Sequence, residues 1–386
     1  MEFKFTETQD KLRAEVRGFL EDELKQGGFE PSNDAWIDGY SQEFSRKVGT
    51  KGWIGTIWPK GYGGKEWSFV DRLIITEELL RFGAPVAYHW MSDRQCGPCI
   101  IAYGSDEQRK DILPRIIKGE VSFALGMSEP DSGSDLASLR TRAVETEDAF
   151  IINGQKIWTS GAHEADYIYL VARTDPDAPK HKGISEFIVD LKLPGITVNP
   201  IVDMMNSHHF NEVYFDNVKV PKTALVGERN RGWYQIAVQL DYERSGLERI
   251  MSPYPMFLMM LDLARQEPSL YNNPEVRHKL TDLVVKFEVG RLLIYRVAWT
   301  LSQGRVPNFE SAMAKVYGTS FEQHLSNIAT QVLGLSGQLM EDSKWAPLRG
   351  LASRSYLFCP GASLRGGTSE ILRNIVALRG LGLPAR

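Results

Sequence analysis

Cysteine is scarce in this chain of 386 residues, with three in all, and long apolar runs are absent. Three cysteines are too few for a disulfide-stabilised secreted domain and are typical of a reducing compartment. The N-terminal segment lacks a positively charged stretch followed by an apolar one, so we expect no signal peptide. No run of about 18 apolar residues exists to form a membrane-spanning helix. These absences predict a cytoplasmic protein without a membrane partner.

An excess of one charge is also missing. Lys and Arg total 45 against 49 Asp and Glu, a net charge of −4, and no basic tract stands out. A nucleic-acid-binding protein is expected to present clustered basic residues, so this class is excluded. Hydrophobic residues make up 42% and charged residues 24%, which is ordinary for a globular protein. The length predicts roughly two or three domains, and an intracellular enzyme is the leading class.

Several binding motifs are absent as well. The seven histidines show no His-Glu-x-x-His motif and no i, i+4 pairing, so we expect no metal site. His208 and His209 would point to opposite faces of a strand. No dinucleotide fingerprint and no P-loop occur. Cys96-Gly-Pro-Cys99 matches the thiol–disulfide pattern but has helical flanks, which favours a Gly-Pro break with two incidental thiols.

The hydrophobic period changes twice along the chain, which predicts an α+β fold of three domains. Residues 1–120 have a helical period and predict an N-terminal helical domain. Residues 121–225 contain short β-rich runs with turn signals at Asn153-Gly and Leu193-Pro-Gly, which indicate a small antiparallel β domain. Residues 226–386 regain the helical period between prolines, which predicts a C-terminal bundle of four or five long helices.

Local signals mark individual helices in the first domain. Thr6 is the expected N-cap of the first helix, with Gln9 at the capping-box position. The apolar pattern over residues 69–81 predicts a helix that ends before Gly83, a glycine stop signal.

One segment suited to ligand binding combines residues 127–135 with residues 156–161. Both stretches follow predicted strands and are rich in hydroxyl groups and backbone N–H groups. Such clusters suit a phosphate-bearing or heteroaromatic ligand, and Trp158 is suited to cover a planar ring. Composition alone equally favours two polar turns with a core tryptophan.

A second segment is the helix predicted over residues 233–250. Its apolar stripe consists of Trp233, Ile236, Leu240, Leu247 and Ile250. Glu243 falls in the middle of this stripe. A carboxylate on a buried helix face is costly unless paired and its pKa should rise, which suits a general base. The alternative is a pairing of Glu243 with an arginine such as Arg244 or Arg365, whereas Glu248 is predicted to be solvated.

Short motifs lie along the whole chain in a fixed order. They are Trp58-Pro-Lys-x-Tyr-Gly-Gly64, Gly97-Pro98, Tyr103-Gly-Ser-Asp-Glu-Gln108, Leu113-Pro114, Ser128-Glu-Pro-x-x-Gly-Ser-Asp135, Asn153-Gly-x-Lys-x-Trp158, Val213-Tyr-Phe-Asp-Asn-Val-Lys-Val-Pro221, Gln331-Val-Leu-Gly334 and Gly366-Gly-Thr-Ser-Glu-Ile371. Each is modest alone, but their order and spacing are specific. By these motifs the chain resembles the acyl-CoA dehydrogenases over essentially its whole length.

The resemblance implies an N-terminal helical domain, a central β domain and a C-terminal four-helix bundle. It also implies that FAD binds between the β domain and the bundle and that a neighbouring subunit closes this site. The positions it assigns to FAD contacts are Met127, Ser128, Ser134, Trp158, Ser160, Gln331, Gly334, Thr368 and Glu370. Ser134 would also face the pantetheine arm of the substrate, and Gln331 and Gly334 match the stretch that reaches FAD in the adjacent subunit. Arg265 is the only candidate for the cofactor-clamping arginine. In the family a run similar to Lys-Thr-Phe usually follows that arginine, whereas here the altered run Gln-Glu-Pro-Ser follows at residues 266–269.

The resemblance also implies dehydrogenation of an acyl-CoA to the trans-2-enoyl-CoA, with α-proton removal by a carboxylate and β-hydride transfer to flavin N5. The enolate that develops would be stabilised by a flavin ribityl hydroxyl and the backbone N–H of Gly366. Many members carry the catalytic glutamate at the position of Gly366. Other members carry the base on a bundle helix in an Asp-x-Glu-Arg pattern, which Asp241, Glu243 and Arg244 match. Glu243 is therefore the predicted base, and Asp241 and Arg244 are predicted to contact substrate.

The altered run after Arg265 and the Gly-Gly-Thr-Ser-Glu-Ile motif at residues 366–371 are similar to those of bacterial family members that degrade steroid side chains. Some of these members are heterotetramers. We expect a branched or bulky acyl chain, an electron-transfer flavoprotein as acceptor, and a homotetramer or homodimer, with a heterotetramer as the alternative. Arg365 either meets a polar or anionic group on the acyl chain, or pairs with Glu243, or points outward. Two other functions stay open: an oxygen-using flavin relative on the same fold, and a non-catalytic flavin-binding subunit of a heteromeric dehydrogenase.

Overall fold

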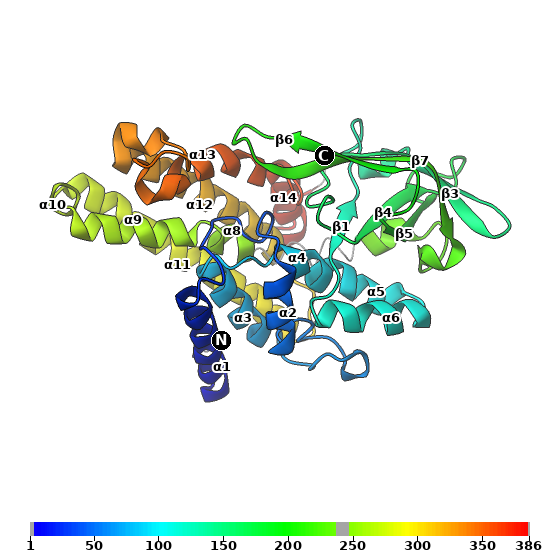
Figure 1. Cartoon of the computed structure of the whole chain (residues 1–386), viewed down its shortest axis with the longest axis horizontal. Helices are drawn as coiled ribbons and strands as arrows, with labels where there is room; N and C mark the ends of the chain where they lie inside the picture. The colour runs from blue at the N-terminus through cyan, green and yellow to red at the C-terminus, as the bar shows by residue number, and fades with distance from the viewer. Residues whose placement is uncertain (1–3, 237–246, 385–386) are drawn as a thin grey trace. The chain divides into compact units, whose positions relative to one another are not determined.

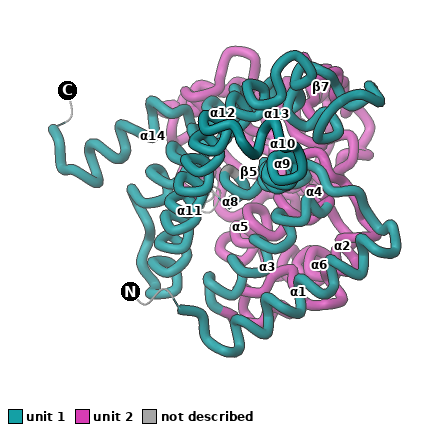
Figure 2. Tube along the Cα trace, turned by 90° about the vertical axis from the view of Figure 1, so that its left-hand side faces the viewer, with its two compact units in different colours: residues 1–36, 68–84, 244–386 teal, residues 37–67, 85–243 magenta. Residues whose placement is uncertain are grey.

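The computed structural model describes residues 4–236 and 247–384 (Figure 1), which form two compact units, drawn in different colours in Figure 2. Unit 1 comprises the described residues of 1–36, 68–84 and 244–386, and unit 2 comprises those of 37–67 and 85–243. Helices build unit 1, whereas unit 2 combines helices with the sheet. Within the described ranges, no helix has both the length and the apolar character needed to cross a bilayer.

Unit 1 is assembled from helices that come from both ends of the chain. Its α-helices are α1 (Glu7–Lys25), α3 (Phe69–Arg81), α8 (Leu247–Met251), α9 (Tyr254–Gln266), α10 (Pro268–Tyr271), α11 (Pro274–Ser302), α12 (Glu310–Leu333), α13 (Leu351–Ala362) and α14 (Ser369–Ile375). Shorter helical turns lie at Gly334–Gln338, Pro347–Gly350 and Val376–Gly380. Helix α12 contacts α8, α11, α13 and α14, so it forms the centre of the bundle.

The signals predicted for the N-terminal helices are confirmed. The Thr6 hydroxyl accepts a hydrogen bond from the Gln9 N–H at 3.2 Å, and the Gln9 side chain accepts one from the Thr6 N–H at 3.1 Å. These two bonds complete the capping box that begins α1. Helix α3 ends at Arg81, and Gly83 follows with a φ of +62°.

Buried charges join α1 and α3 to α11 within unit 1. The Tyr295 hydroxyl donates to Glu77 Oε2 at 2.6 Å, and Arg13 donates to that hydroxyl at 2.8 Å. Arg13 also pairs with Glu78, and Arg291 pairs with Glu77. Burial alone would raise the pKa of Glu77, but the bonds and charges of its arginine partners bring that pKa below its ordinary value. Because Glu77 has cationic partners, it can stay ionised away from water.

Unit 2 contains the sheet and a group of helices. The helices are α2 (Gln42–Thr50), α4 (Ala87–Met91), α5 (Gly97–Tyr103) and α6 (Asp106–Ile117), with short turns at Lys60–Tyr62, Ser92–Cys96, Leu136–Ser138 and Lys222–Ala224 and a helical segment at 232–236. The strands are β1 (Phe123–Gly126), β2 (Arg142–Glu145), β3 (Ala149–Lys156), β4 (Tyr167–Arg173), β5 (Ile184–Asp190), β6 (Ile196–Val202), β7 (His208–Pro221) and β8 (Leu225–Val226).

The sheet has the strand order β6-β7-β3-β2-β4-β5-β8, and β1 pairs with β4. Most neighbouring strands are antiparallel, as predicted, but β1 runs parallel to β4 and one parallel bridge joins β2 to β4. Strands β6 and β7 form a long two-stranded ribbon (Figure 1). Phe150, Phe187 and Phe215 lie in the hydrophobic core on one face of the sheet.

The turn predicted at Asn153-Gly154 is wrong, because both residues lie inside β3. The register between β3 and β7 shifts between Ile152 and Gly154. A Cβ atom at position 154 would lie 2.6 Å from Thr141 Oγ1. The glycine therefore permits a close approach at a bulge in the strand.

The Cys-x-x-Cys pair lies where helices meet, at the end of the Ser92–Cys96 turn and in α5. Cys96 and Cys99 are fully buried and free. Burial raises the pKa of both thiols well above the ordinary value, so little thiolate forms. These observations support the interpretation of the two thiols as incidental.

Candidate functional site

The predicted flavin-facing residues of unit 2 follow the ends of β1 and β3. The Ile157 N–H donates to the Ser128 carbonyl at 2.9 Å. This bond places Met127 and Ser128 beside the turn that carries Trp158 and Ser160. The structure therefore brings together two segments that are distant in the sequence.

A buried ion pair supports this junction. Lys156, fully buried at the end of β3, donates to the Met127 carbonyl and to Glu129 Oε1, both at 2.9 Å. Glu129 also accepts the backbone N–H groups of Arg140 and Thr141, at 2.6 and 2.8 Å. Burial would raise the pKa of Glu129, but Lys156 and these donors bring it below the ordinary value. The charged carboxylate thus ties the end of β3 to the segment after β1.

The Trp158 indole is exposed to solvent beside the bond between Ile157 and Ser128. Its backbone has a φ of +59°, a left-handed conformation that is rare for a bulky residue. Its side chain is 56% exposed and meets the Phe210 ring edge-on, with centroids 5.9 Å apart. The alternative of a core tryptophan is therefore wrong. An exposed aromatic face on a strained turn is a candidate contact for a planar ring.

Strand β7 holds the Trp158 turn through Asn211. The Asn211 carbonyl accepts the Thr159 N–H, and the Asn211 amide Nδ2 donates to the Thr159 carbonyl, both at 3.0 Å. Sequence reasoning missed this residue, although the alternation in β7 contains a signal. Asn211, Val213 and Phe215 share the buried face of the strand. An asparagine on a buried face requires hydrogen-bond partners.

Ser134 is exposed in the loop after β1. The loop is braced on either side of it, because Ser132 Oγ donates to the Asp135 carbonyl at 2.8 Å. Asp135 pairs with Lys180 at 2.9 Å. The Ser134 hydroxyl is thus accessible on a defined loop.

In unit 1, the predicted C-terminal motif forms a turn between α13 and α14. Gly366 and Gly367 have φ values of +68° and +89°, both in the left-handed region that favours glycine. Lys315 of α12 is buried and donates to the Gly367 carbonyl at 2.8 Å. Thr368 caps α14, since its hydroxyl accepts the Ile371 N–H at 3.3 Å. Sequence reasoning missed Lys315, which holds this turn.

Glu370 lies exposed in the first turn of α14, where an acid is favoured by the helix dipole. Its own backbone N–H and the Thr368 hydroxyl lower the pKa of its carboxyl. Glu370 is therefore a fixed negative charge beside the glycine turn.

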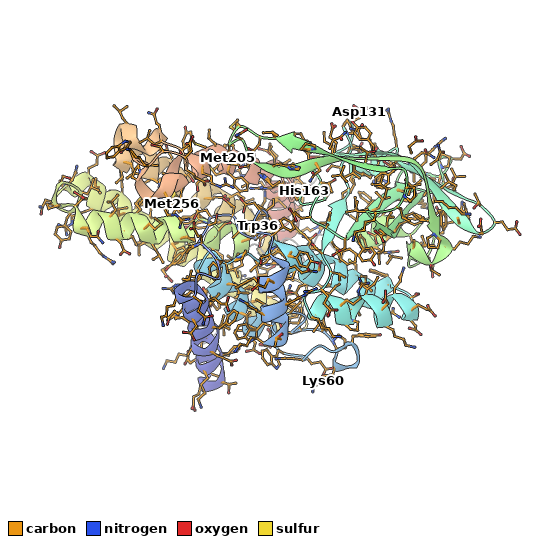
Figure 3. All side chains as sticks on the ribbon, viewed as in Figure 1. Trp36, Lys60, Asp131, His163, Met205 and Met256 are labelled. Carbon is orange, nitrogen blue, oxygen red and sulfur yellow. The ribbon has the colours of Figure 1, made fainter. Side chains whose placement is uncertain are left out.

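The Arg365 side chain folds back into unit 1. Its guanidinium lies 4.1 Å from the centroid of the Phe358 ring and 5.7 Å from that of the Trp36 ring, and Trp36 is labelled in Figure 3. Its Nε and Nη2 atoms are shielded from solvent. The alternative in which Arg365 points outward is therefore wrong.

Three further predicted contacts lie on the surface of unit 1. Gln331 is exposed in the last turn of α12, and Gly334 follows it with a φ of +60°. Arg265 is exposed near the end of α9 and pairs with Asp262 at 2.9 Å. All three positions are accessible to a ligand or to another subunit.

The predicted base Glu243 and its neighbours Asp241 and Arg244 lie outside the described residues. The parts of the predicted stripe on either side are buried, as Ile236 before the gap and Leu247 after it show. The prediction that Glu248 is solvated is wrong, since this residue is 4% exposed. Helix α8 packs against α3, α11 and α12, so its buried surface exceeds one stripe.

A buried acid anchors the helical segment at 232–236 to the sheet. Glu186 of β5 accepts the Tyr169 hydroxyl at 2.9 Å and the Gln235 amide at 2.8 Å, both on Oε2. Gln235 also donates to the Val226 carbonyl at 3.1 Å. Burial raises the pKa of Glu186 to about 8 despite these donors. This shift favours the neutral, protonated form of Glu186 near neutral pH.

Three family descriptions match consecutive parts of the chain. These are the acyl-CoA dehydrogenase N-terminal domain over residues 6–120, the middle domain over residues 124–218 and the C-terminal domain over residues 230–381. The chain belongs to the acyl-CoA dehydrogenase family, whose members are flavin-dependent oxidoreductases. The predicted family, fold class and enzyme class are confirmed.

Relatives match the chain along its full length. Acyl-CoA dehydrogenase FadE26 of Mycobacterium tuberculosis is 35% identical over 403 residues, which cover 100% of this chain and 99% of the relative. A solved structure described as the Tcur3481-Tcur3483 steroid ACAD has 33% identity and a TM-score of 0.90, with 100% of each chain covered. The ChsE4-ChsE5 complex from Mycobacterium tuberculosis has 34% identity and a TM-score of 0.86, again with 100% of each chain covered.

Proposed function

We propose that this chain binds FAD and converts an acyl-CoA to its trans-2-enoyl-CoA. The observation that carries the proposal is the exposed Trp158 indole beside the backbone of Met127 and Ser128. An aromatic face flanked by hydroxyl and amide groups fits a planar heteroaromatic ring that both stacks and hydrogen-bonds. FAD, when bound, supplies the hydride acceptor. The residues proposed to hold it are Met127, Ser128, Ser134, Trp158, Ser160, Arg265, Gln331, Gly334, Thr368 and Glu370.

Glu243 is the proposed base that removes the α-proton of the thioester. Gly366 occupies the position at which many family members carry the base, and it has no side chain to take a proton. The Asp241-Tyr-Glu243-Arg244 pattern supports the alternative position on the bundle helix. Asp241 and Arg244 are proposed to contact the substrate there.

The thioester α-proton is too weak an acid for an unassisted carboxylate, so the developing oxyanion needs a hydrogen-bond donor. The Gly366 N–H is proposed to supply it. Lys315 supports this role, because its bond to the Gly367 carbonyl restrains the turn. A donor held before the reaction begins need not reorganise as charge develops.

An anaerobic screen of acyl-CoAs against the flavin absorbance tests the proposal, with wild type and Glu243→Gln compared. We expect at least one thioester to bleach the wild type. The variant should keep its colour and bind the same thioester but lose reduction by several orders of magnitude, as expected for loss of an essential base. A wild-type protein that binds no FAD, or bleaching at the same rate in both proteins, would overturn the proposal.

A bulky or branched acyl chain is the proposed substrate class. The Tcur3481-Tcur3483 relative is described as a steroid ACAD, which supports a large acyl pocket. Arg365, next to Gly366, is proposed to meet a polar group on that chain, with Phe358 and Trp36 orienting its guanidinium. Arg365→Ala should raise KM for polar acyl-CoAs selectively, and an equal effect on plain chains would contradict this role.

Assembly with further acyl-CoA dehydrogenase chains is proposed, as a homotetramer or homodimer or as a heterotetramer. Helix α11 exposes an apolar stripe formed by Val285, Val289, Leu292 and Trp299. An exposed apolar stripe of this length is typical of an interaction surface. The pairs of chains named for the two solved relatives support the heteromeric form. An electron-transfer flavoprotein is the proposed acceptor, in accord with the resemblance.

A further inference from the structure

The orientation of the Asn211 side chain follows from its partners. The Thr159 carbonyl can only accept, so the atom 3.0 Å from it must be the donor Nδ2. Oδ1 then faces His208 Nε2 at 2.8 Å, and the second Nδ2 hydrogen is directed to His163 Nδ1 at 3.1 Å. Because Oδ1 only accepts, His208 Nε2 carries a proton. Because Nδ2 only donates, His163 Nδ1 carries none.

The two imidazoles face each other outside this amide. Their centroids are 3.9 Å apart and their planes are inclined by 21°. Both histidines are partly exposed to solvent, and His163 is labelled in Figure 3. A proton added to His163 Nδ1 would place two donors against each other and remove the bond to Asn211.

We infer that Asn211 is a positioning residue that holds the left-handed Trp158 turn through Thr159, and that its full network forms only while His163 Nδ1 is unprotonated. The inference rests on the proposed function in one respect, since residues 158–160 are proposed to face the flavin. A non-glycine residue with positive φ persists only where its surroundings enforce that conformation. Asn211 is the side chain of β7 that bonds to the backbone of this turn.

The surroundings of His163 favour its neutral form at neutral pH. Burial and the neighbouring His208 lower its pKa, Glu164 acts in the opposite direction, and the net shift is downward. A bond with Asn211 would raise this pKa only if the amide accepted a proton from the ring, whereas the Nδ2 donor assigned above favours the neutral ring. The other titratable groups nearby are Tyr40, whose ring centroid lies 6.5 Å from that of His163, and His209, which pairs with Asp203 at 3.6 Å. The network is therefore complete at neutral pH and is lost as the pH falls through the lowered pKa of His163.

Variants of the full-length chain test the role of Asn211. Asn211→Asp keeps the shape of the side chain but removes both amide hydrogens. Asn153→Asp is the matched control, because Asn153 bonds to Asn217 on the exposed side of the same sheet, at 3.3 Å. Hydrogen exchange of peptides that cover residues 157–162 is measured by mass spectrometry, and the flavin spectrum and the FAD dissociation constant are measured alongside.

We expect exchange in residues 157–162 to be at least tenfold faster in Asn211→Asp at pH 7.5 and unchanged in the control. The FAD dissociation constant should rise about tenfold, with a shifted flavin absorption band. Unchanged exchange in Asn211→Asp would overturn the inference. A wild type without FAD would instead overturn the proposed function, while the exchange measurement, which needs no flavin, would still decide the role of Asn211.

His163→Gln tests the dependence on protonation, because glutamine offers an acceptor that does not titrate. After correction for the intrinsic effect of pH, exchange of residues 157–162 in the wild type should rise at least threefold between pH 7.5 and pH 5. The variant should show no such rise. Acid acceleration of equal size in both proteins would contradict the part of the inference that concerns His163.

Discussion

The Trp158 turn of unit 2 and the Gly366 turn of unit 1 both use left-handed backbone, but they are stabilised in opposite ways. Trp158 pays a steric penalty, and contacts from β1, β3 and β7 enforce its conformation. Gly366 and Gly367 carry no such penalty, and one buried side chain, Lys315, bonds to the turn. The left-handed conformation of a strained turn therefore depends on residues distant in the sequence, whereas glycines adopt that conformation without such support, even though Lys315 restrains the turn further.

The largest expected effect comes from breaking the ion pair beneath the Trp158 turn. Lys156→Met leaves the Glu129 carboxylate buried without its cation, which typically costs about 3–5 kcal/mol. We expect urea denaturation to show a loss of this size, together with loss of bound FAD. Lys219→Met is the control, since its pair with Asp148 at 2.8 Å is exposed and should contribute little to stability. Equal losses would show that the buried pair has no special role.

The next effect is a pH dependence in the polar interior of unit 2. Glu186 has a pKa of about 8 in the folded chain, raised by burial above the ordinary value of 4.5. Between these values the unfolded chain releases a proton that the folded chain keeps, so stability falls as pH rises, by up to about 1.4 kcal/mol per unit. Glu186→Gln should not show this fall in stability, because a glutamine side chain does not titrate.

Denaturation at pH 5, 6, 7 and 8 checks this expectation. The stability of Glu186→Gln relative to wild type should increase with pH and level off above about pH 8. Glu275→Gln, which changes an exposed acid paired with Lys279, is the control and should show no such trend. Parallel curves for wild type and Glu186→Gln would mean that Glu186 is ionised in the folded chain.

A smaller loss of stability is expected from a substitution in the glycine turn. Gly367→Ala forces a side chain to adopt a φ of +89°, and its Cβ would lie 3.4 Å from Leu372, so backbone strain dominates. We expect a cost of about 1–2 kcal/mol. Gly304→Ala, with a φ of +66° and open space around it, should cost a similar amount. Only Gly367→Ala should slow flavin reduction, by up to about 100-fold if the Gly366 N–H is displaced.

The smallest expected change in stability concerns Arg265. Its exposed pair with Asp262 should contribute less than about 0.5 kcal/mol, so Arg265→Ala should unfold like the wild type. If Arg265 clamps the cofactor, the same variant should weaken FAD binding about tenfold, as expected for a lost charged hydrogen bond. Asp262→Ala removes the pair but keeps the cation and should bind FAD normally. An unchanged FAD affinity in Arg265→Ala would contradict the prediction that Arg265 binds the cofactor.

Sequence signals predicted helix ends correctly where contacts within a few residues determine the structure. The capping box at Thr6 and the glycine stop at Gly83 depend on neighbours within a few residues, and both were predicted correctly. Asn153-Gly154 carried an equally local turn signal, but the pairing of β3 with β7 overrode it.

The candidate site was predictable only in part. Motif order placed Met127, Ser128 and Trp158 in one expected site, and the structure brings these residues together. The roles of Asn211 and Lys315 depend on which carbonyl lies opposite each side chain, which only strand register and helix packing determine. Glu243 lies outside the described residues, so its role stays a prediction.

The buried charges of unit 1 have a consequence for synthesis of the chain. Arg13 bonds to Tyr295, 282 positions later, and Glu77 bonds to Arg291, 214 positions later. While the ribosome is still translating the middle of the protein, the acids on α3 lack Arg291 and Tyr295. The first helices cannot reach their final burial until α11 has emerged, so nascent chains that stop before residue 291 should be bound by chaperones or degraded.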